Sequence, residues 1–276
     1  MNIIELKNIN FTYSDKTQAL KNINITIEEG KTTVILGENG AGKSTLFTLL
    51  NGIIKPNSGE YRFNGNIVNY SKKELFELRK NIGIVFQEPD NQIFSSSVYD
   101  EIAFGPRNLK IPEYEIDNIV KESAKETDVT EYFEKPVHFL SYGQKKRVSI
   151  SSILAMKPKV IIFDEPSACL DVVQKDKLYS LYKKLKNKGI TIIISTHDID
   201  FAYKIADNAI VLKNGECMFN GKIDDLFAND KIVQKSCLKY PPVYILYNEL
   251  IKKHIIKNTY CTPKIIEDII TILNNV

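Results

Sequence analysis

The pattern of apolar and polar positions changes along the chain. Near its start, apolar residues alternate with polar ones over residues 3–11 and again over 20–27, which predicts a short antiparallel β region. Three later runs are nearly uninterrupted apolar segments, at residues 33–36, 160–163 and 190–194. Strands of that kind are covered on both faces, as in the parallel sheet of an α/β domain. We therefore expect an α/β core preceded by an antiparallel β unit.

Helical patterns fill the segments between these strands. Residues 44–50 follow the first buried run, and residues 174–188 separate the other two. From about residue 90 to residue 157 strand signals are weak, and residues 113–127 have helical periodicity. We therefore expect a mostly helical insertion, a helical subdomain, over about 90–157.

The pattern breaks near residue 231, and two helical stretches follow, at residues 243–256 and 263–273. In the second, Thr262 is the expected N-cap and Pro263 the expected first helical residue. The apolar side chains of this helix share one face, which needs to be buried either on the protein's own domain or in a dimer interface. Both alternatives stay open at this point. The residues of this face are Ile265, Ile266, Ile269, Ile270 and Leu273.

Length and charge limit the number of domains and the class of partner that we expect. The 276 residues suffice for one large domain with an appendage or for two domains. The net charge is +3, and from residue 231 onward seven lysines face three acidic residues. A balanced body with a mildly basic tail lacks the clustered positive surface of a nucleic-acid binder. We expect a main domain of residues 1–230, a helical extension of residues 231–276, and no nucleic-acid partner.

Hydrophobicity and cysteine spacing indicate the cellular compartment in which the protein is expected. No stretch approaches the roughly 18 consecutive apolar residues of a membrane-spanning helix, and the start of the chain lacks the basic and apolar regions of a signal peptide. The cysteines are far apart and form no CxxC pair, so reduced cytosolic thiols are favoured over a disulfide framework or a zinc site. They are Cys169, Cys217, Cys237 and Cys261.

Residues 37–44 (GENGAGKS) match the phosphate-loop pattern GxxxxGK[ST] between a predicted strand and a predicted helix. Glycines let backbone N–H groups turn toward phosphate oxygens, and the helix N-terminus adds partial positive charge. Lys43 is expected to reach the β- and γ-phosphates, and Ser44 to coordinate Mg²⁺. The flanking elements disfavour a glycine-rich turn without a ligand. The expected nucleotide-binding residues of this loop are Gly37, Asn39, Gly40, Gly42, Lys43, Ser44 and Thr45.

Asp164 and Glu165 follow the apolar run of residues 160–163. They are therefore expected at the carboxyl end of a buried strand, the edge where ligands bind in open α/β sheets. Asp164 suits the Mg²⁺ shell, and Glu165 is placed to polarise a water for attack on a γ-phosphate. An acidic pair after a strand is usually just the start of a loop, but beside a phosphate loop it is a strong signal.

Further motifs indicate which class of phosphate-loop protein this is. A guanine-specific GTPase would carry NKxD, and the nearest candidate, residues 187–190, lacks the aspartate. Residues 140–147 (LSYGQKKR) resemble the LSGGQ signature of ATP-binding cassette (ABC) proteins, as do Gln87 in VFQ, residues 167–171 (SACLD) and His197 in STHD. The resemblance implies the ABC ATPase form of the P-loop NTPase α/β fold, with an N-terminal antiparallel β subdomain, a helical subdomain and here a small helical extension.

In that family two cassettes pair head to tail, and the resemblance implies matching roles here. ATP held at Lys43 of one subunit is closed by Ser141 and Gly143 of the other, with Gln144 in the same signature. The N-terminus of the following helix points at the γ-phosphate. Asp171 is expected at the dimer seam. ATP and Mg²⁺ are the implied cofactors.

The remaining positions have catalytic or adenine-binding roles by the same resemblance. Gln87 joins Mg²⁺ or the attacking water and reports the nucleotide state to a membrane partner. His197 contacts the γ-phosphate, although a lone histidine after a strand is more often structural. Tyr13 matches the aromatic that stacks on adenine, although an aromatic in an N-terminal strand is as often part of the core. The signature itself departs from LSGGQ at Tyr142, where glycine is commoner.

The subfamily is indicated by residues 85–94 (VFQEPDNQIF), which resemble a stretch of energy-coupling-factor importers, including cobalt importer ATPases. Residues 140–147 and 153–158 (ILAMKP) match the same group, as does a tail with Pro241 and Pro242. The resemblance implies an ATP-hydrolysing subunit that powers uptake of a micronutrient. We expect cobalt ions as cargo, with nickel and vitamins as alternatives.

The implied partners are a second ABC ATPase subunit, identical or paralogous, a transmembrane energy-coupling protein and a substrate-binding membrane protein. The implied location is the cytoplasmic face of the cell membrane, as a peripheral protein. A groove near Gln87 and the helical insertion is expected to receive a helix of the transmembrane partner. Soluble ABC ATPases of DNA repair or translation are a rival class, but they typically have a long coiled-coil insertion or two cassettes. A nucleotide-binding protein without hydrolysis is disfavoured by Glu165 and His197.

Overall fold

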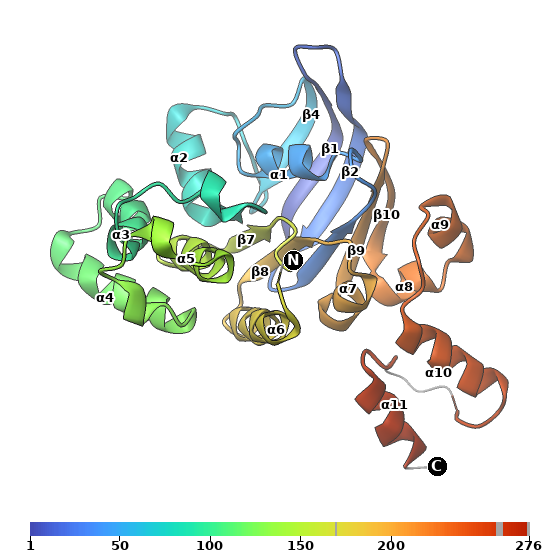
Figure 1. The fold of residues 1–276 in the computed structure, drawn as a ribbon. Helices are drawn as coiled ribbons and strands as arrows, with labels where there is room; N and C mark the ends of the chain where they lie inside the picture. The colour runs from blue at the N-terminus through green and yellow to red at the C-terminus, as the bar shows by residue number, and fades with distance from the viewer. Residues whose placement is uncertain (169, 258–261, 275–276) are drawn as a thin grey trace.

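Two β-sheets organise the chain in the computed structural model, which describes residues 1–168, 170–257 and 262–274 (Figure 1). The smaller sheet is antiparallel and has the strand order β2-β1-β4-β5. Its strands are β1 (Asn2–Thr12), β2 (Gln18–Glu28), β4 (Ser58–Phe63) and β5 (Asn66–Ile67). The predicted antiparallel β region is therefore confirmed.

The larger sheet has the order β10-β9-β3-β8-β7-β6 and is parallel except for the antiparallel pair β9 and β10. Its strands are β3 (Thr32–Leu36), β6 (Ile82–Val85), β7 (Val160–Phe163), β8 (Thr191–Ser195), β9 (Asn208–Lys213) and β10 (Glu216–Lys222). The three apolar runs of the sequence are thus neighbouring strands, and their carboxyl ends share one edge of the sheet.

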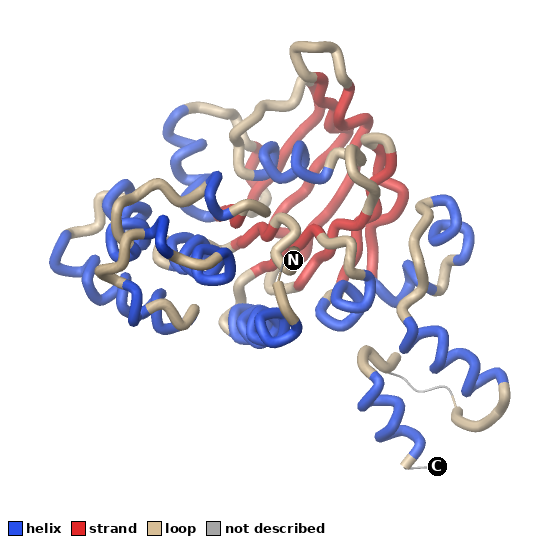
Figure 2. Tube along the Cα trace, viewed as in Figure 1, coloured by secondary structure: helices blue, strands red, loops and turns tan. Residues whose placement is uncertain are grey.

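Both faces of the larger sheet are covered, as the uninterrupted apolar runs predict. Along β3, Ile35 packs in one apolar cluster while Val34 and Leu36 pack in another on the opposite face. The first cluster joins the sheet to α1 (Lys43–Leu50) and the antiparallel sheet. The second includes α6 (Val172–Asn187) and α7 (Ile199–Ile205), which Figure 2 shows below the strands.

A group of helices lies at one end of the molecule (Figure 1). It contains α3 (Val98–Asn108), α4 (Glu113–Glu126) and α5 (Tyr142–Leu154), which share an apolar cluster of their own. Helix α2 (Lys72–Asn81) lies between this group and the antiparallel sheet. Short 3₁₀ turns connect the segments: η1 (Pro89–Asn91), η2 (Thr130–Tyr132) and η3 (Val137–Phe139). The helices expected in this range are present, whereas the subdomain boundary at about 90–157 stays a prediction.

The C-terminal segment forms a second helical group, at the opposite end in Figure 1. Its helices are α8 (Ile223–Phe227), α9 (Asp230–Lys235), α10 (Pro242–Lys252) and α11 (Ile266–Leu273). Helix α10 ends four residues before its predicted end because His254 adopts a left-handed conformation, with φ 58°, and terminates it. None of the helices in the described part of the chain is long and apolar enough to cross a membrane.

The predicted start of the last helix is wrong. Helix α11 begins at Ile266 because the Asp268 carboxylate accepts backbone hydrogen bonds from Lys264 at 2.8 Å and Ile265 at 3.2 Å, which caps the helix there. Of the apolar face, Ile269 is buried, in an apolar cluster that includes residues of α10 and continues into the larger sheet. Three other members are 40–50% exposed: Ile266, Ile270 and Leu273.

Candidate nucleotide-binding and catalytic site

The phosphate loop connects β3 to α1, as its sequence pattern predicts. Gly42, the N-cap of α1, has a left-handed φ of 103°, and a Cβ there would lie 2.7 Å from the carbonyl oxygen of Ala19. At Gly37 a Cβ would lie 2.3 Å from the carbonyl oxygen of Leu212. Neither position accommodates a side chain, so the loop can keep its backbone close to neighbouring strands and its N–H groups available for phosphate.

Lys43 is the first residue of α1 and is 8% exposed. Its ammonium group donates to the carbonyl oxygens of Gly37 at 2.7 Å and Glu38 at 3.1 Å. Burial lowers the pKa of this amine, while the nearby carboxylates of Glu165 and Asp164 oppose that shift. The cation is thus held inside the loop by neutral carbonyls, where an incoming phosphate can attract it.

Asp164 and Glu165 follow β7 at the edge where β3 also ends, and Ser195 at the end of β8 ties them together. The Ser195 hydroxyl donates to one Asp164 carboxylate oxygen at 2.6 Å and accepts from the Glu165 backbone N–H at 2.9 Å. The Ser44 hydroxyl donates to the other Asp164 oxygen at 3.2 Å. Our sequence reasoning did not single out Ser195. The signal available was a polar residue closing the apolar run of β8.

Glu165 combines an unusual backbone with a buried side chain. Its φ is 42°, a left-handed conformation that costs a non-glycine residue about 1–3 kcal/mol and is frequent at active sites. The side chain is 13% exposed, and its carboxylate lies 3.1 Å from Nε2 of His197. Burial raises the pKa of Glu165, while the charges of His197 and Lys43 oppose the rise. A carboxyl group with a raised pKa is better matched to proton transfer near neutral pH.

His197 connects the acidic pair to the phosphate loop. Its Nε2 lies 3.0 Å from the side-chain oxygen of Asn39 as well as 3.1 Å from Glu165. The loops after β3, β7 and β8 therefore meet through three side chains, since each of these strands ends at the same edge of the sheet. This arrangement brings the expected catalytic glutamate and histidine into direct contact.

The loops after β3, β6 and β7, with the turns that join β1 to β2 and β9 to β10, line a cavity of about 620 Å³, and His197 is not among its lining residues. The predicted site residues that line it are Tyr13, Asn39, Gly40, Gly42, Lys43, Ser44, Thr45, Gln87, Asp164 and Glu165. The Tyr13 hydroxyl lies 2.8 Å from that of Thr45, which places the aromatic ring beside the phosphate loop, and the ring is 42% exposed rather than part of the core. Lining residues that the sequence did not indicate are Thr17, Gln18, Ala19, Lys21, Asn214 and Gly215.

The signature residues are not among those that line this cavity. Ser141 is the N-cap of α5: its hydroxyl accepts from the Gln144 N–H, and the Gln144 side chain accepts from the Ser141 N–H. Asp171 caps α6 by accepting from the N–H of Gln174 at 2.8 Å. The side chain of Gln174 lies so close to Gly143 that a Cβ there would be 3.0 Å from it. The fold thus brings Asp171 and the signature together, and their ATP roles stay predictions.

The oxygen donors beside the phosphate loop fit a magnesium ion. Ser44 and Asp164 are already in hydrogen-bond contact, and Gln87 lines the same cavity. Hydroxyl, carboxylate and amide oxygens are the hard ligands that Mg²⁺ prefers. In the described residues, no three His, Cys, Asp or Glu side chains converge in a way that could hold a metal ion by themselves. Cys169 and Cys261 lie outside the described residues, and Cys217 and Cys237 are free thiols.

Comparison with known proteins places this site in a family. The sequence profile of the family described as ABC transporter matches residues 20–168. Energy-coupling factor transporter ATP-binding protein EcfA3 of Clostridium perfringens is 46% identical over 242 residues, which are 87% of this chain and 85% of that protein. The corresponding protein EcfA of Methanocaldococcus jannaschii is 45% identical over 253 residues, 92% of this chain and 91% of that protein.

Solved structures agree with these relatives. The structure described as cbiO1 from Clostridium perfringens, part of the ABC transporter complex cbiONQ, has a TM-score of 0.76 and 45% identity and covers 90% of this chain and 99% of its own. A dimeric ATP-binding cassette in a post-hydrolysis state, bound to ADP and Pi, has a TM-score of 0.73 and 31% identity, with 80% and 98% coverage. The chain belongs to the ABC transporter family, as an ATPase subunit of the energy-coupling-factor type.

Proposed function

We propose that this subunit hydrolyses Mg-ATP as one half of a head-to-tail pair and thereby powers uptake of cobalt ions through separate membrane proteins. The observation that supports hydrolysis is the contact between the Glu165 carboxylate and His197 beside the phosphate-loop cavity. The cobalt assignment is supported by the likeness of residues 85–94 and 140–158 to cobalt importer ATPases. Nickel and vitamin importers of the same type are the alternative cargoes.

The chemistry assigned to the chain follows from these positions. Lys43 and the backbone N–H groups of the loop bind the β- and γ-phosphates, and bound Mg²⁺ neutralises phosphate charge. Glu165 accepts a proton from the attacking water, and His197 holds that carboxylate and contacts the γ-phosphate. Ser195 keeps Asp164 and the Glu165 backbone in register during this step. Ser141 and Gly143 complete the site of the second subunit.

A second cavity supports the assignment of a membrane partner. A groove of about 490 Å³ runs between α2, α3 and α5, with exposed aromatic rings at Phe76, Phe94 and Phe104 and a basic rim at Arg79 and Lys80. Phe94 and Phe104 contact each other edge to face, with ring centroids 4.6 Å apart. Solvent-exposed aromatic residues clustered in a groove are typical of helix-docking sites. We assign this groove to a helix of the transmembrane energy-coupling protein.

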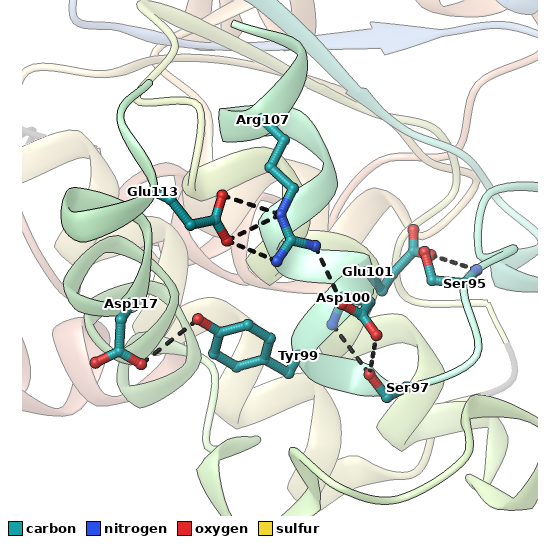
Figure 3. Close-up of polar contacts among 8 residues, drawn as sticks. All are labelled: Ser95, Ser97, Tyr99, Asp100, Glu101, Arg107, Glu113 and Asp117. Carbon is teal, nitrogen blue, oxygen red and sulfur yellow. Dashed lines mark hydrogen bonds and ion pairs between the residues drawn. The ribbon is translucent and has the colours of Figure 1, made fainter. Parts of the chain in front are cut away.

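Polar contacts hold α3 and the loop before it in place, and one of the residues involved, Glu101, lines the groove (Figure 3). The buried carboxylate of Glu101 accepts hydrogen bonds from the backbone N–H groups of Phe94 at 3.1 Å and Ser95 at 2.9 Å, which fixes the loop that presents Phe94. Arg107 pairs with Asp100 on its own helix and with Glu113 at the start of α4. The loop that presents Phe94 and the position of α3 against α4 are therefore fixed before any partner binds.

Replacing Phe104 with Ala should weaken the complex with the membrane proteins without changing ATP hydrolysis by the isolated subunit. The loss of a central aromatic anchor typically costs 2 kcal/mol or more, which is about 30-fold in affinity. Tyr114→Ala is the matched control, because Tyr114 is an exposed aromatic on α4 outside the groove. Binding to the partners in detergent would be measured for both variants, and equal affinities would exclude the groove as the docking site.

The C-terminal extension is assigned to subunit pairing. Ile266, Ile270 and Leu273 of α11 are exposed although Ile269 is buried, and Ile245 and Leu246 of α10 are exposed as well. Exposed apolar side chains of this kind are stabilised when a second subunit covers them. The partner subunit is either the same chain or a paralogue, and the extension serves both cases.

The proposed function is tested by purifying the subunit from membranes and identifying the proteins that copurify. We expect a transmembrane energy-coupling protein and a substrate-binding membrane protein, and ATP-dependent uptake of ⁵⁷Co²⁺ by vesicles that contain the complex. Uptake of nickel or a vitamin instead would replace the cargo assignment alone. Copurification with ribosomes or DNA and no membrane protein would refute the importer assignment, which places the subunit at the cytoplasmic face of the membrane.

A further inference from the structure

Tyr142, the residue at which the signature departs from LSGGQ, makes a specific hydrogen bond in the structure. The phenol of Tyr142 donates a hydrogen bond to the backbone carbonyl oxygen of Gln87 at 3.0 Å. Gln87 lines the phosphate-loop cavity, whereas Tyr142 directly follows Ser141, the signature residue that caps α5. Glycine at this position has no side chain to make the bond. The hydroxyl therefore joins two segments that are 55 residues apart in sequence.

Helix α5 makes further hydrogen bonds with residues 86–92. Lys146, one turn after Tyr142 and 2% exposed, donates to the carbonyl oxygens of Phe86 at 2.7 Å and Gln87 at 2.9 Å. The side chain of Gln92 accepts from the Phe86 N–H at 3.0 Å and donates to the Ser149 carbonyl at 3.2 Å. Residues spaced by four share a helix face, so Tyr142 and Lys146 hold one carbonyl together.

These bonds attach the Gln87 segment to different parts of α5. Lys146 and Gln92 attach the segment to the body of α5, beyond its first turn. Tyr142 attaches it at the first residue of α5, next to the N–H groups and the Ser141 hydroxyl that the signature offers, and Lys145 adds an ion pair with Asp90 three residues later. Residues in the first turn of a helix lack part of the hydrogen bonding that rigidifies the interior. A side-chain bond there fixes the orientation of the signature more than one placed further along.

We propose that Tyr142 is a positioning residue that makes the Gln87 segment and the signature move as one unit. ATP in the cavity of one subunit then sets, through Gln87, the orientation of the signature which that subunit presents to its partner. The two ATP sites of the pair become coupled by a contact within each chain. This inference rests on the proposed paired ATPase.

The direct test is hydrogen–deuterium exchange of the full chain with and without Mg-ATP. In the wild type, ATP should slow exchange both in residues 85–92 and in residues 140–147. In Tyr142→Phe, which keeps the ring and removes the hydroxyl, the first segment should respond as in the wild type, whereas the ATP-induced protection of the second should fall by about fivefold, as for one lost neutral hydrogen bond. Tyr99→Phe is the control, because it removes a phenol hydroxyl from α3, a helix of the same group.

Steady-state kinetics provides a readout that a purely structural role would not change. Tyr142→Phe should flatten the sigmoidal dependence of hydrolysis on ATP concentration and lower kcat about fivefold, while the Kd for ATP stays within about twofold of the wild type. Wild-type exchange of residues 140–147 and wild-type cooperativity in Tyr142→Phe would overturn the inference. A wild-type protein that fails to bind ATP would instead overturn the proposed function, and the inference with it.

Discussion

Glu165→Gln should abolish ATP turnover while it leaves ATP binding intact and traps an ATP-bound dimer. The amide keeps the size and the polar contacts of the carboxylate, which lies 3.1 Å from His197, but it cannot accept a proton from water. A general base contributes about 10²- to 10⁴-fold to rate, so we expect kcat to fall by at least about 100-fold. Trapping follows because the nucleotide that closes the interface is no longer consumed.

Two measurements check this expectation. Phosphate release reports turnover, and light scattering after size-exclusion chromatography in Mg-ATP reports the dimer. Glu216→Gln is the matched control, because Glu216 is an exposed residue of β10 outside the cavity. Full hydrolysis by Glu165→Gln would show that another group is the base, and a monomer in Mg-ATP would contradict the paired ATPase.

Lys43→Ala should remove most of the affinity for ATP. The ammonium group is held by the carbonyl oxygens of Gly37 and Glu38 at the centre of the phosphate loop, and no other side chain of the loop carries a positive charge. A hydrogen bond to a charged group contributes about 1.5–3 kcal/mol, which corresponds to about 10- to 100-fold in Kd. We expect a loss in that range for ATP and its analogues.

Isothermal titration calorimetry with a non-hydrolysable ATP analogue measures this loss. Lys31→Ala, at an exposed position just before β3, is the control for the removal of one positive charge. Thermal unfolding of both variants shows whether the protein still folds. An unchanged Kd in folded Lys43→Ala would contradict the assignment of residues 37–44 as the phosphate-binding loop.

The part of the site that could be predicted consists of residues whose role depends on their neighbours in the sequence. The phosphate loop, Asp164 and Glu165 each lie directly after a buried strand, and the carboxyl ends of parallel strands meet at one edge of the sheet. Ser195 was not predicted because its importance arises from hydrogen bonds to both members of the acidic pair on the neighbouring strand. Only the pairing of β7 with β8 brings these groups together.

The misplaced start of α11 has a related cause. Thr262 and Pro263 form a good start signal for a helix, but Asp268 caps the chain three residues later through the N–H groups of Lys264 and Ile265. Two capping solutions compete within a few residues, and a local pattern cannot rank them. The ammonium group of Lys264 also contacts Asp224 of α8, a tertiary contact that favours the later start.

The sequence by itself determined the class of fold, three of the buried strands and the nucleotide loop, because these depend on short-range periodicity and on motifs of fixed spacing. The tertiary structure alone decided how separate motifs are joined: His197 to Asn39 and Glu165, and Tyr142 to the Gln87 carbonyl. Such contacts connect side chains with side-chain or backbone groups far away in sequence. Their partners are selected by the packing of strands and helices, and a change from glycine to tyrosine reveals its consequence only when that packing is known.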